Sequence, residues 1–187
     1  YTVYKNAPKT LQEVYFAATA HGESEFIIYQ AERWTFNTFF QQAWSLADAL
    51  TTKHNIAQGD RVGIAMRNYP EWLSTFVAIT SIGALAVPIN SWGTERDLLF
   101  AVRDSDCKTV FCDQQRHTLM AEGLAESSIN AVVARSGLSS TIEFGETLED
   151  FIADSKDASP PKVSVDSEDH ALIMYTSGTT GQPKGAV

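Results

Sequence analysis

The fold is decided by residues 61–90, which read RVGIAMRNYPEWLSTFVAITSIGALAVPIN. Residues 61–66 form a short apolar run that is typical of a buried strand. Pro70 suits the first turn of a helix, because the N–H group that proline lacks would have no intrahelical partner there. Residues 84–89 form a second apolar run of strand length. We therefore predict a strand, a helix and a second strand, in that order.

The same region contains 23 consecutive uncharged residues, from Trp72 to Thr94, which approaches the length that spans a bilayer. Hydroxyl and amide side chains interrupt this run, and Pro88 would break a spanning helix. A buried helix followed by a buried strand explains the same residues more simply. We therefore predict no transmembrane segment.

Strands and helices continue to alternate on the C-terminal side of this region. Thr94 and Asp97 resemble a capping pair that begins a helix, and Asp113 can cap another. Apolar runs at 108–112 and 130–134 predict further strands. Strand-helix-strand units pack as a parallel sheet with helices on both sides. The predicted fold class is therefore α/β, a parallel sheet flanked by helices on both faces.

The N-terminal part of the chain has a different pattern. We predict a helix over 11–21, two short strands over 26–30 and 33–35, and a helix that begins at Phe36. In this second helix apolar residues recur at steps of three and four, which places the aromatic rings on one face. Such a stripe is typical of a core rather than of a ligand site. It consists of Phe36, Phe39, Phe40, Ala43, Trp44, Ala47 and Leu50.

The end of the chain combines glycines, hydroxyl groups and one lysine in a single loop, residues 175–185, after a predicted buried strand at 171–175. Gly178 and Gly181 can adopt positive φ, which lets backbone N–H groups converge on an anion. Lys184 adds a compact positive charge. The composition therefore predicts a site for a polyphosphate. Four hydroxyl groups complete it, those of Thr176, Ser177, Thr179 and Thr180.

Two simpler explanations account for this loop less well. Gly, Ser, Thr and Pro are common in surface turns, but a turn needs neither four hydroxyl groups nor a lysine after an apolar strand. The usual nucleotide P-loop has four residues between its glycines and Ser or Thr after its lysine. Here two residues separate Gly178 from Gly181, and Gly185 follows Lys184. The P-loop pattern does not match.

The loop resembles the phosphate loop of the adenylate-forming superfamily, which includes acyl-CoA synthetases, luciferases and the adenylation domains of peptide synthetases. This resemblance implies that residues 1–187 are the incomplete N-terminal portion of an AMP-binding domain, with 175–185 as its phosphate loop. The asparagine at position 90 resembles the residue that acyl-CoA synthetases have at this place more than the one that amino-acid-activating domains have. Other blocks follow the family order, namely Arg33–Phe36, Gly59–Val62, Asn68–Trp72, Gly83–Asn90 and Asp104–Ser105.

The resemblance also implies a reaction. A carboxylic acid, fatty or aromatic, attacks the α-phosphate of ATP to give an acyl-adenylate, and the thiol of coenzyme A then takes the acyl group. Mg²⁺ would lie beside the phosphates, in part held by Thr176. The family's catalytic lysine and acyl pocket fall beyond Val187, so we expect a fragment that is inactive alone and assign it no catalytic residue. Phosphate contacts are implied for Thr176, Ser177, Gly178, Thr179, Thr180, Gly181 and Lys184.

Two other functions are compatible with the same residues. The chain can belong to an adenylation domain that loads a carrier protein instead of coenzyme A. It can also be a non-enzymatic module that binds a partner and keeps the loop as a remnant. The acceptor of the acyl group and the activity of the longer protein distinguish these alternatives from an acyl-CoA ligase.

Composition and charge exclude several classes of protein. A chain of 187 residues with 44% hydrophobic residues can form one sizeable core. Its net charge is −9, of which residues 143–169 contribute −7. We interpret 136–169 as an acidic, linker-like segment, with a short helix near 147–155. Nucleic-acid binding requires clustered lysine and arginine, so we expect no nucleic-acid partner.

The remaining reactive side chains give little indication of function. Cys107 and Cys112 lack the spacing of a metal site, and we expect two buried, reduced thiols. The four histidines are scattered, and we expect them at the surface or at helix caps. The N-terminus shows no apolar signal core, so the expected location is cytoplasmic. The histidines are His21, His54, His117 and His170.

Overall fold

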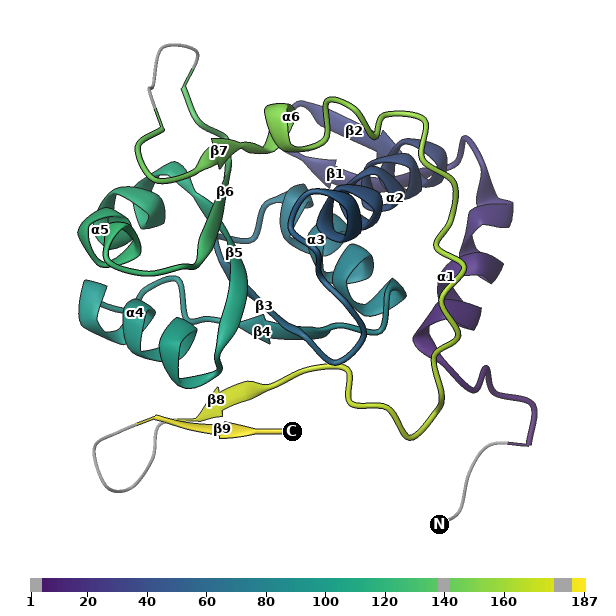
Figure 1. Ribbon diagram of the computed structural model, residues 1–187. Helices are drawn as coiled ribbons and strands as arrows, with labels where there is room; N and C mark the ends of the chain where they lie inside the picture. The colour runs from purple at the N-terminus through teal and green to yellow at the C-terminus, as the bar shows by residue number, and fades with distance from the viewer. Residues whose placement is uncertain (1–4, 138–141, 177–182) are drawn as a thin grey trace.

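The computed structural model describes residues 5–137, 142–176 and 183–187. A parallel sheet lies between two layers of helices, which confirms the predicted α/β fold (Figure 1). Its order is β4-β3-β5-β6-β7, and every neighbouring pair is parallel. The strands are β3 (Arg61–Ala65), β4 (Leu85–Pro88), β5 (Cys107–Asp113), β6 (Asn130–Ala134) and β7 (Glu146–Thr147).

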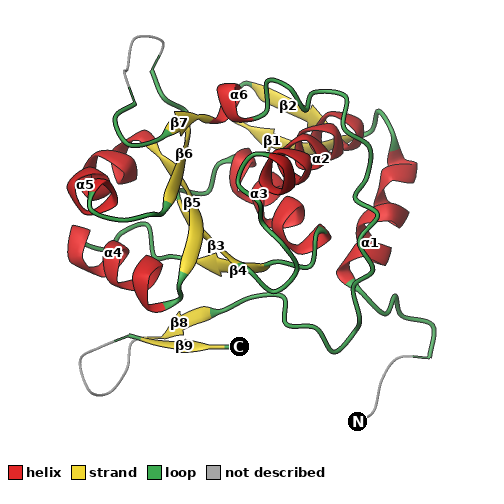
Figure 2. Ribbon diagram, in the orientation of Figure 1, coloured by secondary structure: helices red, strands yellow, loops and turns green. Residues whose placement is uncertain are grey.

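Helices cover both faces of this sheet, as Figure 2 shows. Val62 and Ile64 belong to the core on one face, whereas Ala65 belongs to the core on the other, because successive side chains of a strand point in opposite directions. Within the described ranges, no helix is both long enough and apolar enough to cross a bilayer. The first face carries α2 (Phe36–Thr52), α3 (Pro70–Ser81) and α6 (Leu148–Phe151), and the second carries α4 (Glu95–Asp104) and α5 (Gln114–Ala125).

Three predicted helix starts are confirmed by the structure. Thr94 and Asp97 form a reciprocal capping box at the start of α4. The carboxylate of Asp113 accepts a hydrogen bond from the N–H of Arg116 at 3.0 Å and so caps α5. Pro70 occupies the first turn of α3, which has no side-chain cap. The starts of α4 and α5 therefore follow from side chains that satisfy free N–H groups, and that of α3 from a residue that has no N–H to satisfy.

The N-terminal elements pack on α2. β1 (Glu25–Tyr29) and β2 (Glu32–Thr35) form an antiparallel hairpin, and α1 (Leu11–Ala18) continues as the 3₁₀ helix η1 (Thr19–His21). The aromatic stripe is buried as predicted: the rings of Phe40 and Trp44 stack with their centres 5.3 Å apart. This third core attaches the hairpin and α1 to the helix layer.

The acidic segment is packed more closely than its composition indicated. It contains β7 and α6, and α6 is shorter than the predicted helix. Residues 152–173, which we call the strap, run from α6 across α2 and α1 to the C-terminal strands (Figure 1). The side-chain amide of Gln41 donates to the carbonyl of Lys156 at 2.6 Å, and that of Gln12 donates to the carbonyl of Val163 at 3.0 Å. Helix side chains therefore satisfy the backbone of a segment that resembled a linker.

The predicted buried strand at 171–175 is wrong in position and burial. The observed strand is β8 (Met174–Thr176), which pairs antiparallel with β9 (Lys184–Ala186). Among the described residues, a single bridge between Leu172 and Ala86 joins this part of the chain to β4. Met174 is 56% exposed. The apolar run therefore ends at the edge of the parallel sheet instead of inside it.

Contrary to the prediction, His117 is buried and the side chain of His54 is only 9% exposed, whereas the two cysteines are buried thiols as expected. Burial raises the pKa of Cys107 to about 11. His117 is 3% exposed. The ring of His54 contacts Thr109 Oγ1 at 3.0 Å and Glu146 Oε1 at 3.2 Å. Polar partners from distant elements thus allow His54 to lie inside the protein.

The burial of His54 predicts a loss of stability in acid. Desolvation lowers its pKa below the ordinary 6.5, Lys53 acts in the same direction, and Glu146 opposes both. Below that pH the unfolded chain binds a proton that the folded protein resists, so the free energy of unfolding should fall as pH decreases through the folded pKa. Urea unfolding between about pH 8 and about pH 5.5 measures this effect, to which buried His117 contributes with the same sign. In a His54→Gln variant the free energy of unfolding should fall less over this pH range. An unchanged fall would show that His54 is not the cause.

Candidate phosphate-binding site

The structure brings together the two ends of the predicted phosphate loop. Thr176 is paired with Lys184 across β8 and β9, and the hydroxyl group of Thr176 donates to the carbonyl of Lys184 at 3.4 Å. Both residues are exposed. A hydroxyl group and an ammonium group therefore lie at the base of one loop. The other predicted contacts lie outside the described residues, namely Ser177, Gly178, Thr179, Thr180 and Gly181.

The strands of this hairpin rest on α4. The Oη atom of Tyr175 donates to Oδ2 of Asp104 at 2.7 Å. Burial raises the pKa of the Tyr175 phenol well above its ordinary value, and the bond to Asp104 adds to this shift. A Cβ atom at Gly185 would lie 3.0 Å from Cγ2 of Ile173, so the close packing of the hairpin favours glycine there.

This anchor lies near the amino end of a strand of the parallel sheet. Asp104 ends α4, just before β5 begins at Cys107. The chain pairs with the outer edge of β4 through the bridge at Leu172 and then meets α4 through Tyr175.

The carboxyl ends of β3 and β5 form a second candidate site. β3 lies between β4 and β5. The connection after β3 therefore leads to the strand on one side of it, and the connection after β4 leads to the strand on the other side. Ligands of parallel sheets commonly bind at such a switch point. Asp113 Oδ2 accepts from the N–H of Arg67 at 3.0 Å, and both carboxylate oxygens of Asp113 lie 3.2 Å from the guanidinium of Arg116. This buried pair fixes the two strand ends.

An exposed aromatic ring and a cation lie together at this edge. The guanidinium carbon of Arg67 is 3.1 Å from the ring centre of Trp92, and Trp92 is 77% exposed. Arg116 Nε donates to the carbonyl of Ser91 at 2.8 Å, which positions the loop after β4. A planar ring beside a positive charge suits a nucleotide, which offers a base to stack and a phosphate to pair.

Arg135, just after β6, ties three elements together. Its guanidinium forms two hydrogen bonds with Glu32, at 2.9 and 3.0 Å, and one with Glu71 at 3.0 Å. It also lies over the rings of Tyr29 and Tyr69, 5.0 and 4.8 Å from their centres. The bonds to Arg135 lower the pKa of Glu32. The backbone of Arg135 has a φ of 54°, a conformation that residues other than glycine adopt rarely.

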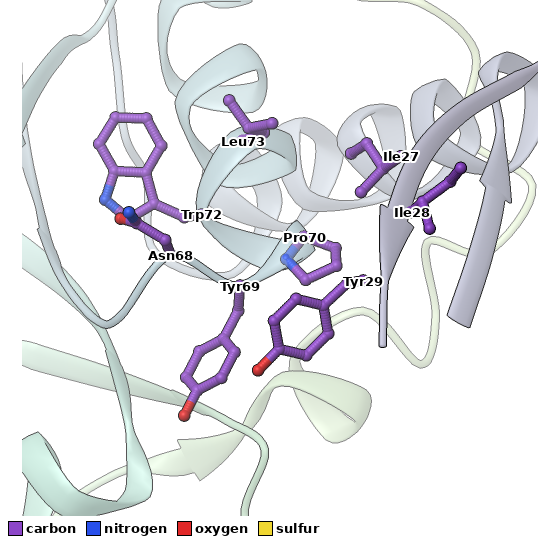
Figure 3. A pocket seen from close by; sticks show the side chains of 8 residues that line it. All are labelled: Ile27, Ile28, Tyr29, Asn68, Tyr69, Pro70, Trp72 and Leu73. Carbon is purple, nitrogen blue, oxygen red and sulfur yellow. The ribbon is translucent and has the colours of Figure 1, made fainter. Parts of the chain in front are cut away.

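The same two tyrosines line an open hollow of about 420 Å³ between β1 and the start of α3. Figure 3 shows their rings side by side, and the ring planes meet at 86° with centres 5.7 Å apart. Most of the lining is apolar, so the hollow suits an apolar group. Its residues are Ile27, Ile28, Tyr29, Asn68, Tyr69, Pro70, Trp72 and Leu73.

The sequence carries a signal for these residues. Arg67, Asp113 and Arg135 each come at or just after the end of a predicted strand. Polar residues at the carboxyl ends of parallel strands meet at one edge of the sheet. Which of them are neighbours depends on strand order, and the sequence alone did not supply that order.

Comparison with curated proteins gives the family of the chain. The model of the family described as AMP-binding enzyme matches residues 15–187. A 3-hydroxybenzoate–CoA ligase of Aromatoleum sp. (strain CIB) is 34% identical over 72% of this chain and 25% of the ligase. A long-chain-fatty-acid–CoA ligase of Mycobacterium tuberculosis (strain ATCC 25618 / H37Rv) is 34% identical over 75% of this chain and 26% of that ligase. The matched part is about a quarter of each relative.

Solved structures agree with this result. An anthranilate CoA ligase in complex with anthranoyl-AMP superimposes with a TM-score of 0.83 at 21% identity, over 98% of this chain and 36% of that one. The inhibitor-bound N-terminal domain of FACL13 from Mycobacterium tuberculosis gives a TM-score of 0.78 at 26% identity, over 96% of this chain and 44% of that one. With the fold shared and the family model matching nearly its whole length, the chain belongs to the AMP-binding enzyme family.

Proposed function

We propose that this chain is the N-terminal part of an ATP-dependent acyl-CoA ligase, which activates a carboxylic acid as its acyl-adenylate and transfers the acyl group to coenzyme A. The observation that carries the proposal is the pairing of Thr176 with Lys184 at the base of the glycine-rich loop, in a chain of the AMP-binding family. The relatives described above support it, since both are named as CoA ligases. One of them acts on an aromatic acid and the other on long-chain fatty acids.

In this proposal the loop holds the β- and γ-phosphates of ATP. Displacement at phosphorus depends mainly on positioning and on neutralising charge, so Lys184 would stabilise the negative charge of the phosphates. The hydroxyl groups of Thr176, Ser177, Thr179 and Thr180 would donate to phosphate oxygens. Backbone N–H groups at Gly178 and Gly181 would complete the cradle.

Thr176 is the residue of this chain that fits a role beside Mg²⁺. Thr176 is exposed, and among the described residues its hydroxyl group makes one long hydrogen bond of 3.4 Å, so its oxygen is accessible. Mg²⁺ takes oxygen ligands and usually keeps several waters. One protein oxygen together with phosphate oxygens and water would therefore complete its coordination. When bound, the ion would supply positive charge beside the phosphates.

Coenzyme A is the acceptor that the names of the relatives support. Within this chain, the exposed ring of Trp92 and the guanidinium of Arg67 suit its adenine and phosphate groups. We propose a fatty acid as the acid that is activated, with an aromatic acid as the second candidate. The segment by itself would be inactive, because the loop supplies only part of the contacts that a nucleotide needs.

The experiment is exchange of labelled pyrophosphate into ATP by the full-length protein. We expect exchange that depends on an added carboxylic acid, with long-chain fatty acids tested beside 3-hydroxybenzoate and short acids. The acid with the highest kcat/KM identifies the substrate class. Absence of exchange with every acid would overturn the ligase proposal. Thioester formed on a carrier protein and none on coenzyme A would identify the carrier-loading alternative.

A further inference from the structure

We propose that Asp104 is a positioning residue for the phosphate loop and acts through Tyr175. The inference rests on the proposed function, because it concerns how the loop is held for ATP. Asp104 lies at the end of α4 and Tyr175 lies in β8, so the two belong to separate elements. Asp104 itself touches no predicted phosphate contact within the described residues; its effect would be transmitted by one hydrogen bond.

The hairpin that carries the loop depends on such an anchor. β8 and β9 have three residues each, and a two-stranded hairpin of this size is not stable on its own in water. Most of its side chains are exposed. Its backbone is joined to the sheet at Ala86, which receives a hydrogen bond from the N–H of Ile173 at 2.9 Å. Side-chain contacts from Tyr175 therefore decide how the hairpin lies on α4.

Tyr175 makes two kinds of contact with α4. Its hydroxyl group donates to Asp104 at 2.7 Å, a short and direct hydrogen bond. Its ring meets the ring of Phe100 edge to face, with centres 6.3 Å apart and planes at 79°. The next residue is Thr176, the first predicted phosphate contact. A displacement of Tyr175 therefore moves Thr176 directly.

The position of Asp104 in its helix supports this role. Asp104 is the last residue of α4, where the helix dipole disfavours a negative charge. The neighbouring cation, Arg103, donates instead to the carbonyl of Gly123 at 3.0 Å. A carboxylate at this position therefore does not stabilise α4. The hydroxyl group of Tyr175 is the side-chain partner that the structure shows for it.

The test uses the full-length protein and measures ATP·Mg²⁺ affinity by calorimetry together with steady-state kinetics. We expect Asp104→Ala to raise the Kd and the KM for ATP about three- to tenfold, the effect of one lost hydrogen bond, with the KM for the carboxylic acid unchanged. Asp104→Asn keeps an oxygen acceptor and should restore most of the affinity. Tyr175→Phe should match Asp104→Ala, and the double variant should be no weaker than either single one.

A matched control is Glu126→Ala, which removes an exposed acid at the end of α5 that makes no hydrogen bond to the hairpin in the described part of the chain. It should leave the affinity for ATP unchanged. If the unaltered protein does not bind ATP, the proposed function fails. If the unaltered protein binds ATP and Asp104→Ala binds it equally well, the positioning role fails. Loss of affinity without recovery in Asp104→Asn, accompanied by a lower Tm, would also overturn that role, because it would indicate a general structural effect.

Discussion

We expect the Lys184→Ala variant of the full-length protein to bind ATP·Mg²⁺ about ten- to a hundredfold more weakly than the unaltered protein, because a charge-assisted hydrogen bond contributes roughly 1.5–3 kcal/mol. Lys184 is exposed in this structure, so solvent and salt would screen part of its charge. The loss should therefore be greatest at low ionic strength. Calorimetric titration of ATP·Mg²⁺ at two salt concentrations measures both effects.

Two control variants make this test specific. Lys162→Ala removes an exposed lysine from the strap and should not change the affinity for ATP. Lys184→Arg keeps the positive charge and should retain part of the affinity for ATP. The retention should be incomplete, because the planar guanidinium cannot take the place of the compact ammonium group without a change of geometry. Equal affinities of Lys184→Ala and the unaltered protein would support the non-enzymatic module, in which the loop is a remnant.

The second large effect should come from Arg135→Ala, which we expect to lower the free energy of unfolding by about 2–3 kcal/mol. The substitution leaves Glu32 and Glu71 without their shared cation, and the side chain of Glu71 is only 13% exposed. A partly buried carboxylate that loses its partner is costly, while the partial exposure of Glu32 reduces the penalty. Urea unfolding of both proteins at neutral pH measures the difference.

Ionisation of Glu32 gives this prediction a second, independent part. Because Arg135 lowers the pKa of Glu32 in the folded protein, the stabilisation is fully present above the ordinary value of 4.5 and is lost as pH falls through the folded pKa. The difference between the two proteins should therefore shrink in acid. Arg33→Ala is the control, since its ion pair with Glu25 is exposed and 3.6 Å long, and it should cost less than about 0.5 kcal/mol. A similar loss in both variants would contradict the role of Arg135.

Much of the fold could be predicted because its determinants are local. The capping box of Thr94 and Asp97 and the proline at position 70 each set a helix start within one turn of chain. The aromatic stripe on α2 identified a buried face by its spacing alone. The α/β class then followed from the alternation of strands and helices. None of these features depends on residues far away in the sequence.

The features that were missed depend on distant partners. Arg135 meets Glu71 and Glu32, which are 64 and 103 positions away, and the strand order decides that they meet. The side chain of His54 is largely enclosed because Glu146, 92 positions away, provides a hydrogen-bond partner for its ring. The apolar run 171–175 leaves the sheet after Ile173, because in the described part of the chain Ala86 is its one partner in β4. Residue type and spacing within a short window do not contain this information.

The strap has a consequence for the order in which the molecule forms. The hydrogen bond from Gln12 to Val163 joins residues 151 positions apart, and that from Gln41 to Lys156 joins residues 115 positions apart. Closing such a long loop costs more chain entropy than closing the short loop of a single helical hydrogen bond, so we expect these bonds to form after the helices they rest on. The C-terminal hairpin follows the strap in the chain. Because this hairpin also rests on α4, we expect it to form only after the sheet and helices that support it are in place.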